Sequence, residues 1–353
     1  MINYDVIIIG AGQAGLSMGY FLRKTSLSFL ILDRLSDVGE VWKKRYNSLT
    51  LFTPRNYSSL PGLKLVGNQQ EFPTKNEIAD YLSNYTNHFS LPIQMDTEVL
   101  KLSQLNNGYE VKTTKGVLVA KKVIIATGPF QDPYVPKFSQ LLSEDVIQIH
   151  SSQYKDPTQL SDGLTLVVGA GNSGMQIAAE ISKIRTVYLS VGEKIKFFPE
   201  KIGHHSIFWW LDHLGLYQFK VDSLIGKFLK NQQDPVIGLQ YKSLIKNNRI
   251  LLKSRTISVE KDTITFADDS NITIRNVIWS TGYRANYHWI DIPMIKDVEG
   301  LPIHKRGITP IDGVYFLGLP WQSTRGSSLL SGVGSDAEYL YQHIIGKSIK
   351  ITI

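Results

Sequence analysis

Two short apolar runs in the chain are each followed by a glycine-rich turn and then by a helical pattern. The first run covers residues 4–9 and the second covers residues 164–168. Continuous apolar runs of this length are typical of strands that are buried on both faces, as in a parallel sheet between helices. The repetition predicts two α/β units within one chain.

After each turn the pattern changes to further helices and short strands. Thr74 and Glu77 have the spacing of a capping box, which predicts a helix over residues 75–85. A small antiparallel insert and the buried strand after it are predicted over residues 98–102, 109–114, 117–120 and 122–128. The later elements are predicted over residues 175–182, 186–190, 250–274, 276–283, 313–318 and 334–343.

This order of elements predicts that one unit is inserted into the other. The last strand and the last helix would return to complete the first sheet. We therefore expect an α/β fold of two Rossmann-like dinucleotide-binding domains. The first domain would be discontinuous, over residues 1–155 and 283–353, and the second would cover residues 156–282.

The first turn carries Gly10, Gly12 and Gly15. In such a unit the first glycine permits the tight turn, the second lets a pyrophosphate approach the backbone, and the third permits close helix–strand packing. Free N–H groups and the helix dipole favour an anion at the helix N-terminus. Asp33 ends the next predicted strand, where a ribose hydroxyl needs an acceptor. The spacing predicts a dinucleotide site, with an ordinary strand–helix turn as the alternative.

The second turn predicts a nicotinamide dinucleotide site. The residues expected to hold the pyrophosphate are Gly169, Gly171, Asn172, Ser173 and Gly174. No acid ends the strand predicted over residues 186–190, so the usual acceptor for an unphosphorylated ribose is missing. Lys194 would attract a 2′-phosphate and Glu193 would repel it. We expect NADPH to be used and NADH to be tolerated, with a plain charged surface loop as the alternative for this segment.

Composition and charge are those of a globular enzyme. The chain has 353 residues, of which 42% are apolar, and a net charge of +7. Its lysines are scattered, with no basic helix and no aromatic-basic platform, so a nucleic-acid partner is not expected. No apolar run reaches the roughly 18 residues of a membrane span, and no signal peptide is recognisable. We expect no membrane span and a cytoplasmic location.

Cysteine is absent from the chain. This excludes structural disulfides, thiolate metal sites and a dithiol redox relay. A metal site at His204, His205 and His213 is not expected either, since adjacent histidines point apart on a helix and His213 is more than two turns away. Trp209 and Trp210 would form a lid, a contact between the subunits of a homodimer, or ordinary core packing.

Taken together, these motifs resemble those of the small bacterial flavin-containing monooxygenases and the related flavoproteins associated with cation efflux. The matching segments are residues 10–15, 39–42, 51–54, 126–128, 169–174, 280–283 and 331–334, with Pro133 and Pro136. The resemblance implies FAD on the first domain, a nicotinamide dinucleotide on the second and the flavin ring between them. The family signature FxGxxxHxxxY is kept at His150 and Tyr154, whereas Glu144 and Val146 replace its Phe and Gly.

The resemblance also implies a reaction. NADPH would reduce FAD, a flavin C4a-hydroperoxide would form with O2, and a small molecule with a soft sulfur or nitrogen, such as a thioether or an amine, would be oxygenated. An NAD(P)H oxidase or diaphorase without oxygen insertion needs the same nucleotide sites, and a redox-sensing accessory protein is a third alternative. A dithiol enzyme of the thioredoxin-reductase kind is excluded by the absence of cysteine.

Position near strand ends, together with the resemblance, identifies the candidate site residues. The catalytic candidates that would line the pocket of flavin and nicotinamide are Thr53, Arg55, His150 and Arg325. The candidates for cofactor binding are Gly10, Gly12, Gln13, Ala14, Gly15, Asp33, Arg34, Gly39, Glu40, Trp42, Arg45, Val99, Ala126, Thr127, Gly128, Gly169, Gly171, Asn172, Ser173, Gly174, Lys194, Thr281, Gly282 and Gly318.

Overall fold

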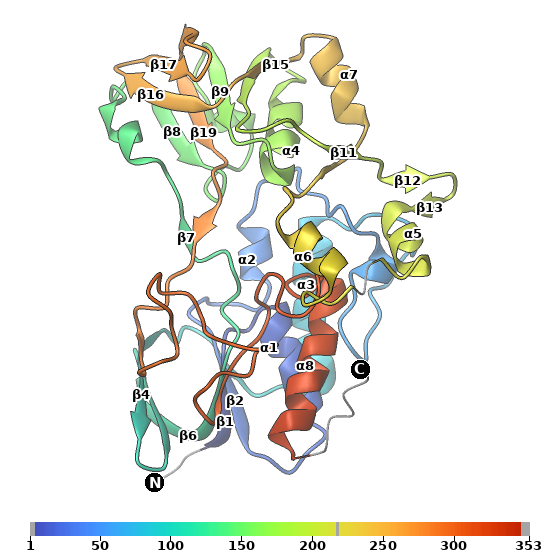
Figure 1. The fold of residues 1–353 in the computed structure, drawn as a ribbon, viewed down its shortest axis with the longest axis vertical. Helices are drawn as coiled ribbons and strands as arrows, with labels where there is room; N and C mark the ends of the chain where they lie inside the picture. The colour runs from blue at the N-terminus through green and yellow to red at the C-terminus, as the bar shows by residue number, and fades with distance from the viewer. Residues whose placement is uncertain (1–3, 217–218, 347–353) are drawn as a thin grey trace.

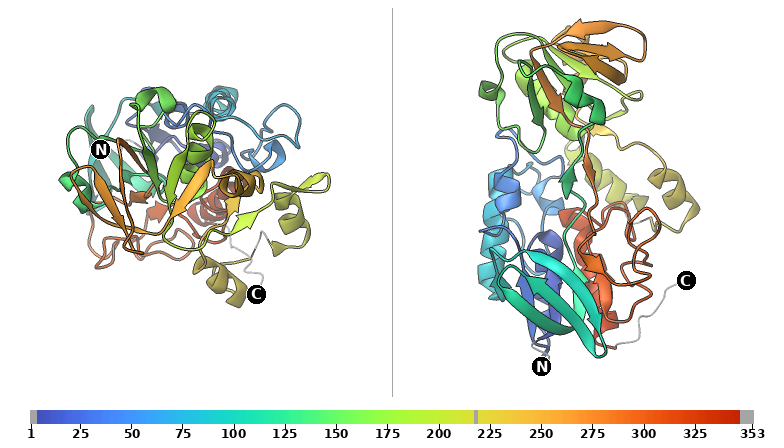
Figure 2. Two further views of the ribbon diagram at one scale, coloured as in Figure 1. Left: turned by 90° about the horizontal axis from the view of Figure 1, so that it is seen from above. Right: turned by 90° about the vertical axis from the view of Figure 1, so that its left-hand side faces the viewer.

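Two α/β units make up the fold, one above the other in Figure 1, and the computed structural model describes residues 4–216 and 219–346. The chain passes between the units along two short strands, β7 (Asp132–Pro133) and β20 (Tyr283–Arg284). These strands pair antiparallel, with Tyr283 opposite Pro133. Both crossings therefore lie at one narrow place, which is also visible in Figure 2.

The first unit, which lies lower in Figure 1, is built on an eight-stranded sheet. Its strands are β1 (Tyr4–Ile9), β2 (Phe29–Leu32), β3 (Ile93–Gln94), β4 (Val99–Leu105), β5 (Gly108–Thr113), β6 (Gly116–Ile125), β21 (Ile290–Asp291) and β22 (Val314–Phe316). Their order is β21-β4-β5-β6-β1-β2-β3, and β22 also pairs with β6. The pairs among β3, β2, β1, β6 and β22 are parallel, whereas β4 and β5 extend β6 as an antiparallel ribbon.

Alternating side chains of β1 supply two separate cores. Val6 and Ile8 pack with the buried residues of α1 (Gln13–Leu22), α3 (Lys75–Phe89) and α8 (Leu330–Ile344). Ile7 and Ile9 belong to a second core, which they share with Tyr109 and Val111 of β5 and Ile290 of β21. The continuous apolar run of β1 is thus explained by burial on both faces.

The second unit has a fully parallel sheet in the order β15-β10-β9-β19-β8. These strands are β8 (Ile147–His150), β9 (Thr165–Val168), β10 (Val187–Ser190), β15 (Ile250–Lys253) and β19 (Asn276–Trp279). On one face lie α4 (Asn172–Ile181) and α7 (Gln240–Lys246). The other face is covered by the antiparallel strands β16 (Thr256–Glu260), β17 (Thr263–Phe266) and β18 (Asn271–Thr273).

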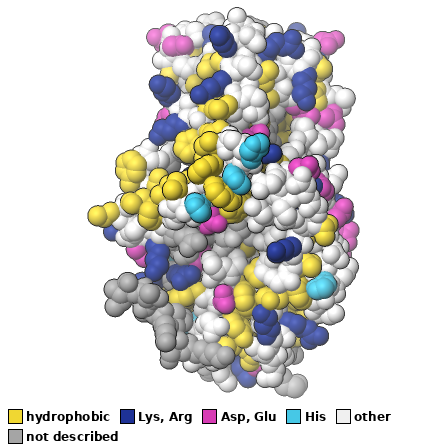
Figure 3. All heavy atoms as spheres, turned by 90° about the vertical axis from the view of Figure 1, so that its right-hand side faces the viewer, with side chains coloured by type: hydrophobic (Ala, Val, Ile, Leu, Met, Phe, Trp, Pro, Cys, Tyr) yellow, Lys and Arg dark blue, Asp and Glu magenta, His cyan; other side chains and the backbone are white. Residues whose placement is uncertain are grey.

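Residues 197–216 and 219–237, which we call the excursion, leave the second unit and run beside the first (Figure 1). Its elements are β11 (Phe197–Phe198), β12 (Lys201–Ile202), β13 (His205–Ser206), α5 (Ile207–His213), α6 (Leu224–Lys230) and β14 (Val236–Ile237). The N–H of Val221 donates to the carbonyl oxygen of Ser323 at 2.7 Å. The exposed apolar residues of the excursion include Leu214, Leu224 and Phe228. Apolar side chains gather on the face of the molecule that Figure 3 shows.

Short helical elements complete the chain: α2 (Glu40–Lys43) and the 3-10 turns η1 (Arg55–Tyr57), η2 (Lys137–Leu141) and η3 (Pro157–Gln159). The predicted capping box of α3 is present, since the Glu77 N–H donates to Thr74 Oγ1 at 3.3 Å and the Thr74 N–H donates to Glu77 Oε2 at 2.8 Å. Within the two described stretches of chain, no helix is both long and apolar enough to cross a membrane.

The structure differs from the predicted elements in several places. α3 runs to Phe89 instead of residue 85, α4 begins at Asn172 instead of residue 175, and the strand predicted over residues 276–283 ends at Trp279. The strands predicted over residues 117–120 and 122–128 are one strand, β6, because one end of β6 pairs with β5 and the other with β1. The last helix begins at Leu330 instead of residue 334. β8 lies in the second sheet although it precedes residue 156. The domain boundaries stay a proposal. We now place the start of the second domain before Ile147.

Candidate active site

The first glycine turn, between β1 and α1, leaves open space only at its middle glycine. Gly10 has a φ of +113°, and a Cβ there would lie 2.5 Å from the carbonyl oxygen of Ala126. A Cβ on Gly15 would lie 1.9 Å from the carbonyl oxygen of Gly10. A Cβ on Gly12, the N-cap of α1, would meet nothing within 4 Å. Backbone packing thus requires the outer glycines, and the middle one leaves room for a ligand at the helix N-terminus.

The second turn, between β9 and α4, repeats this geometry. Gly169 has a φ of +102°, and a Cβ there would lie 2.3 Å from the carbonyl oxygen of Ser280. A Cβ on Gly174 would lie 1.9 Å from the carbonyl oxygen of Gly169, whereas one on Gly171 would meet nothing within 4 Å. Each sheet therefore has an equivalent anion cradle where its parallel strands end.

The side chain of Asn172, next to the second cradle, is used within the chain. Its Nδ2 donates to the carbonyl oxygen of Pro235 at 3.2 Å, and its Oδ1 accepts from the N–H of Ile237 at 2.9 Å. Asn172 thus holds the end of the excursion on α4. Its N–H and that of the half-buried Ser173 belong to the first turn of α4, where helix N–H groups have no partner in the helix.

Asp33 follows β2 directly and lies beside the first turn. Its Oδ2 accepts from the N–H of Ala11 at 2.7 Å and its Oδ1 accepts from the N–H of Leu35 at 2.9 Å. A carboxylate oxygen has two lone pairs, so Asp33 retains acceptor capacity for a ribose hydroxyl. The neighbouring Arg34 is exposed.

The C-terminal part of the chain covers the start of α1. Gln13 Nε2 donates to the carbonyl oxygen of Ser328 at 3.1 Å. A Cβ on Gly318, which has a φ of +83°, would lie 2.8 Å from the Cβ of Ala14. Both ends of the chain therefore build the first cradle.

The short segment around α2 has one unpaired donor. The Nε1 of Trp42 is buried and has no hydrogen-bond partner among the described residues, so it is available to a ligand. The carboxylate of Glu40 instead serves the chain, because hydrogen bonds from Lys44 and Ser36 lower its pKa to about 2. Gly39, with a φ of +86°, lies against the backbone of α3.

Small residues after β6 and β19 lie at the crossing between the units. Gly128 and Gly282 have φ values of +70° and +84°, and a Cβ on either would meet nothing within 4 Å. The hydroxyl of Thr281 donates to the carbonyl oxygen of Tyr134, and the Tyr134 N–H donates to the carbonyl oxygen of Gly282 at 2.9 Å. Thr127 is exposed beside them.

His150 is part of this crossing. Its Nε2 lies 3.0 Å from the carbonyl oxygen of Gly282 and its Nδ1 lies 2.8 Å from Ser152 Oγ. Burial lowers the pKa of His150, and the nearby guanidinium of Arg45 lowers it further. Arg45 also donates to the hydroxyl of Tyr283. Both ring nitrogens of His150 are therefore occupied within the chain.

The other three catalytic candidates lie elsewhere. Thr53 Oγ1 lies 2.9 Å from Ser58 Oγ, and the buried guanidinium of Arg55, two residues on, pairs with Glu77 of α3. Arg325 pairs with Asp234 of the excursion at 2.7 Å. Within the described part, no hydrogen bond or ion pair joins Thr53 and Arg55 to His150 or Arg325. All four stay predictions as catalytic residues.

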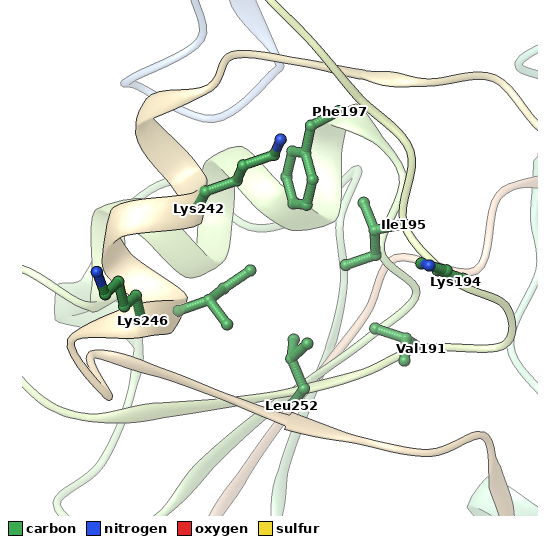
Figure 4. A pocket seen from close by; sticks show the side chains of 8 residues that line it. Val191, Lys194, Ile195, Phe197, Lys242, Lys246 and Leu252 are labelled. Atoms are coloured by element: carbon green, nitrogen blue, oxygen red, sulfur yellow. The ribbon is translucent and has the colours of Figure 1, made fainter.

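Of the remaining cofactor candidates, Val99 is packed at the edge of the core of the first unit. Lys194 is exposed and lines an open cavity of about 330 Å³ beside α7 (Figure 4). The other lining residues include Val191, Ile195, Phe197, Lys242, Lys246 and Leu252. The cavity has an apolar floor and lysines at its rim.

The aromatic stretch of the excursion packs upon itself and against the first unit, where Phe208 stacks on Phe52 with ring centroids 6.0 Å apart. Trp209 stacks between His205 and His213, with ring centroids 4.0 and 4.8 Å away. Trp210 Nε1 donates to the carbonyl oxygen of Ile202 at 3.2 Å. Among the residues that the structure describes, no group of three or more side chains could hold a metal ion. A subunit contact at this place stays a prediction.

Tyr46 and Gln176 are two residues at the contact between the two units that the sequence analysis did not predict. Tyr46 follows α2 but is buried among residues of the second unit. Its hydroxyl donates to Gln176 Oε1 at 2.8 Å. No local pattern marks Tyr46, because its neighbours are polar and its partner lies 130 positions away.

The chain is similar in sequence and in structure to known oxidoreductases. The family described as pyridine nucleotide-disulphide oxidoreductase matches residues 7–197. An uncharacterized CzcO-like oxidoreductase of Geobacillus kaustophilus is 52% identical over 97% of this chain and 98% of its own. The uncharacterized oxidoreductase CzcO of Bacillus subtilis is 49% identical over 98% of this chain and 100% of its own. The structure of a flavin-containing monooxygenase from Stenotrophomonas maltophilia is similar with a TM-score of 0.82 and 25% identity, covering 98% of this chain and 99% of that one.

Proposed function

We propose that this chain, which belongs to the pyridine nucleotide-disulphide oxidoreductase family, is an FAD-dependent monooxygenase that uses NADPH and O2 to oxygenate thioethers or amines. Its similarity to a flavin-containing monooxygenase supports the oxygenating activity. NADH is accepted less well. The first unit holds FAD and the second holds the nicotinamide dinucleotide.

The observation that carries this proposal is the pair of equivalent glycine turns. Gly12 and Gly171 are open, each is the N-cap of a helix, and each follows a buried parallel strand. Two dinucleotides can therefore bind in one chain, one at the end of each sheet. The buried and unpaired Nε1 of Trp42 supports a ligand on the side of the first cradle.

The chain's own groups have binding and orienting roles. The N–H groups at the start of α1 and α4 bind the two pyrophosphates, and Asp33 accepts from the ribose of FAD. The chemistry that bound FAD supplies is hydride acceptance and oxygen activation. At the crossing, Arg45 donates to the hydroxyl of Tyr283, whose ring packs edge-on against that of His150, and these contacts keep the two units in register.

NADPH is favoured because β10 ends in Ser190, whose hydroxyl donates to the carbonyl oxygen of Ser254 at 2.9 Å. No carboxylate stands there to accept from a ribose. Lys194 is exposed and forms no ion pair within the described residues, whereas Glu193 next to it opposes a phosphate. The opposite charges of Lys194 and Glu193 predict a moderate preference for NADPH over NADH.

The competing function is an oxidase or diaphorase that reduces flavin without oxygenating a substrate. A disulfide-reducing role through the chain's own thiols is excluded because the chain contains no cysteine. The test is to supply purified yellow protein with NADPH, O2 and a small thioether. We expect the sulfoxide to form in step with oxygen uptake. Hydrogen peroxide as the sole product would instead identify the oxidase.

A further inference from the structure

A side chain of the first unit is built into the core of the second. Tyr46 is only 2% exposed and packs with Tyr154 and Met175 around α4. Its hydroxyl donates to Gln176 Oε1 at 2.8 Å, and Gln176 Nε2 donates to the carbonyl oxygen of Thr50 at 3.2 Å. The two hydrogen bonds close a ring that fixes the amide of Gln176 against one segment, residues 43–50.

The backbone of the same segment is held from both units. Lys75 of α3 is buried, and its ammonium donates to the carbonyl oxygens of Lys43 and Arg45. From the other side, the Asn47 N–H donates to the carbonyl oxygen of Lys155 at 2.7 Å. Residues 43–50 are therefore a rigid bridge rather than a free loop, because most of their polar groups are paired.

The two ends of this bridge lie at the two cofactor sites. On one side the segment continues directly from α2, which carries the unpaired Nε1 of Trp42. On the other side Gln176 lies one helical turn after Asn172, the first residue of α4, whose N-terminus is the second cradle. A displacement of α4 would thus reach the segment beside FAD through Tyr46, whose hydroxyl meets Gln176 and also Ser173 of α4.

We propose that Tyr46 and Gln176 are positioning residues that couple binding of NADPH at α4 to the placement of the flavin-side segment for hydride transfer. The inference rests on the proposed function. The step is the transfer of a hydride from NADPH to oxidised FAD with uptake of one proton, which yields NADP⁺ and FADH2. Its rate depends steeply on alignment, since a displacement of about 1 Å can cost 10²-fold.

Packing alone does not account for the pair. A phenylalanine would fill the same core volume, and a buried hydroxyl needs a partner. The partner here is held in turn by the backbone of the segment that carries the tyrosine. Such a closed pair specifies the orientation of the segment relative to α4 as well as its burial.

The test compares Tyr46→Phe and Gln176→Met with the unchanged protein. Tyr46→Phe keeps the ring in the core, and Gln176→Met keeps the length of the side chain. Flavin reduction by NADPH is followed in anaerobic stopped flow, and reduction by dithionite serves as a reaction that does not use α4. We expect the limiting rate with NADPH to fall about tenfold or more in both variants. The flavin content, the apparent Kd for NADPH and the dithionite rate should change less than twofold.

The double variant gives a second criterion. If the two side chains act as one unit, its rate should equal that of either single variant rather than the product of the two losses. Tyr241→Phe is the matched control, because Tyr241 is buried in the same core but belongs to α7. We expect it to leave the rate unchanged.

Hydrogen exchange provides a readout besides activity. NADP⁺ should slow amide exchange in residues 43–50 of the unchanged protein, and Tyr46→Phe should abolish this protection. Wild-type rates and full protection in both variants would overturn the inference alone. Equal losses with NADPH and dithionite would show a merely structural role and overturn it too. An unchanged protein whose flavin NADPH cannot reduce would overturn the proposed function, and the inference with it.

Discussion

At the scale of single residues, the middle glycine of each turn leaves room for a ligand, whereas the outer glycines are required by backbone packing. Substitution of the middle glycine should therefore reduce ligand binding, and substitution of an outer glycine should reduce stability. Gly12→Ala adds a methyl group in open space at a φ of −77°, so stability without ligand should be unchanged or higher by about 0.5 kcal/mol. The same methyl group occupies the place of the pyrophosphate, and the purified protein should retain less than about a tenth of its FAD.

Gly15→Ala is the matched control for that prediction. Its Cβ would lie 1.9 Å from a backbone oxygen, so the fold itself should lose about 1–3 kcal/mol. Urea unfolding and the flavin absorbance of the purified variants check both effects. Full flavin occupancy in Gly12→Ala would show that FAD binds elsewhere.

The choice of nicotinamide nucleotide is also decided by single side chains. Glu193→Arg replaces a repelling carboxylate by a fork that can bind a 2′-phosphate in a bidentate manner. We expect the ratio of kcat/KM for NADPH over NADH to rise at least tenfold, or about 1.4 kcal/mol. Glu193→Gln should give an intermediate ratio, since it removes the charge without adding a donor fork. An unmoved ratio in both variants would mean that this loop does not meet the ribose.

At the scale of elements, two histidines give the stability a pH dependence with a defined sign: His150, which ends β8 beside the crossing, and His304 of the first unit. Burial and Arg45 lower the pKa of His150, and burial and Lys230 lower that of His304. Below about pH 6.5 the unfolded chain therefore binds protons that the folded chain does not, and stability falls as the pH falls. Above that pH neither residue contributes to the dependence.

The measurement is urea unfolding at pH 7.5 and pH 5.5. The free energy of unfolding should be lower at pH 5.5, and His150→Gln should reduce the difference between the two values. His88→Gln serves as the control, because His88 lies on the exposed side of α3. A difference that stays the same in His150→Gln would assign the effect to other groups.

The elements also show which parts of the fold can be predicted from the sequence. Both glycine turns, the capping box of α3 and the return of the C-terminal strand depend on local signals, namely apolar runs, turn residues and cap spacing, and the structure has all of them. The sequence did not predict that β6 is one continuous strand. Its continuity comes from pairing with β5 at one end and with β1 at the other, and no local pattern in the sequence marks it. Tyr46 was missed for the same reason, since a contact across 130 positions leaves no periodic trace.

Within the candidate site the same distinction applies. Residues whose role depends on backbone geometry, such as Gly10 and Gly169, could be identified from spacing alone. The side chains of Glu40, Asn172 and Arg55 could not be assigned, because a polar residue near a cradle can serve the chain instead of the ligand. Only the contacts in the structure separate these two uses.

At the scale of the whole molecule, the two crossings make the units separable in principle. Pro133 and Tyr283 are already an antiparallel pair, so replacing residues 134–282 by Asn-Gly would close β7 and β20 with a two-residue hairpin turn. The shortened chain keeps the complete first sheet, including β22, together with α1 and α8. It should therefore fold and bind FAD, with a stability lower by about 1–3 kcal/mol because Tyr46 loses its buried site.

The shortened chain should hold flavin that dithionite bleaches and NADPH does not, because α4 and the second cradle are gone. The complementary fragment, residues 134–282, has its own sheet and both of its cores except for Tyr46 and Leu49, so it should bind NADP⁺ in a calorimetric titration. Gly171→Ala in that fragment should abolish the binding, since its methyl group would occupy the open side of the cradle. If NADPH instead bleaches the shortened chain at the rate of the complete protein, the nicotinamide must bind to the first unit, and the assignment of one dinucleotide to each sheet is wrong.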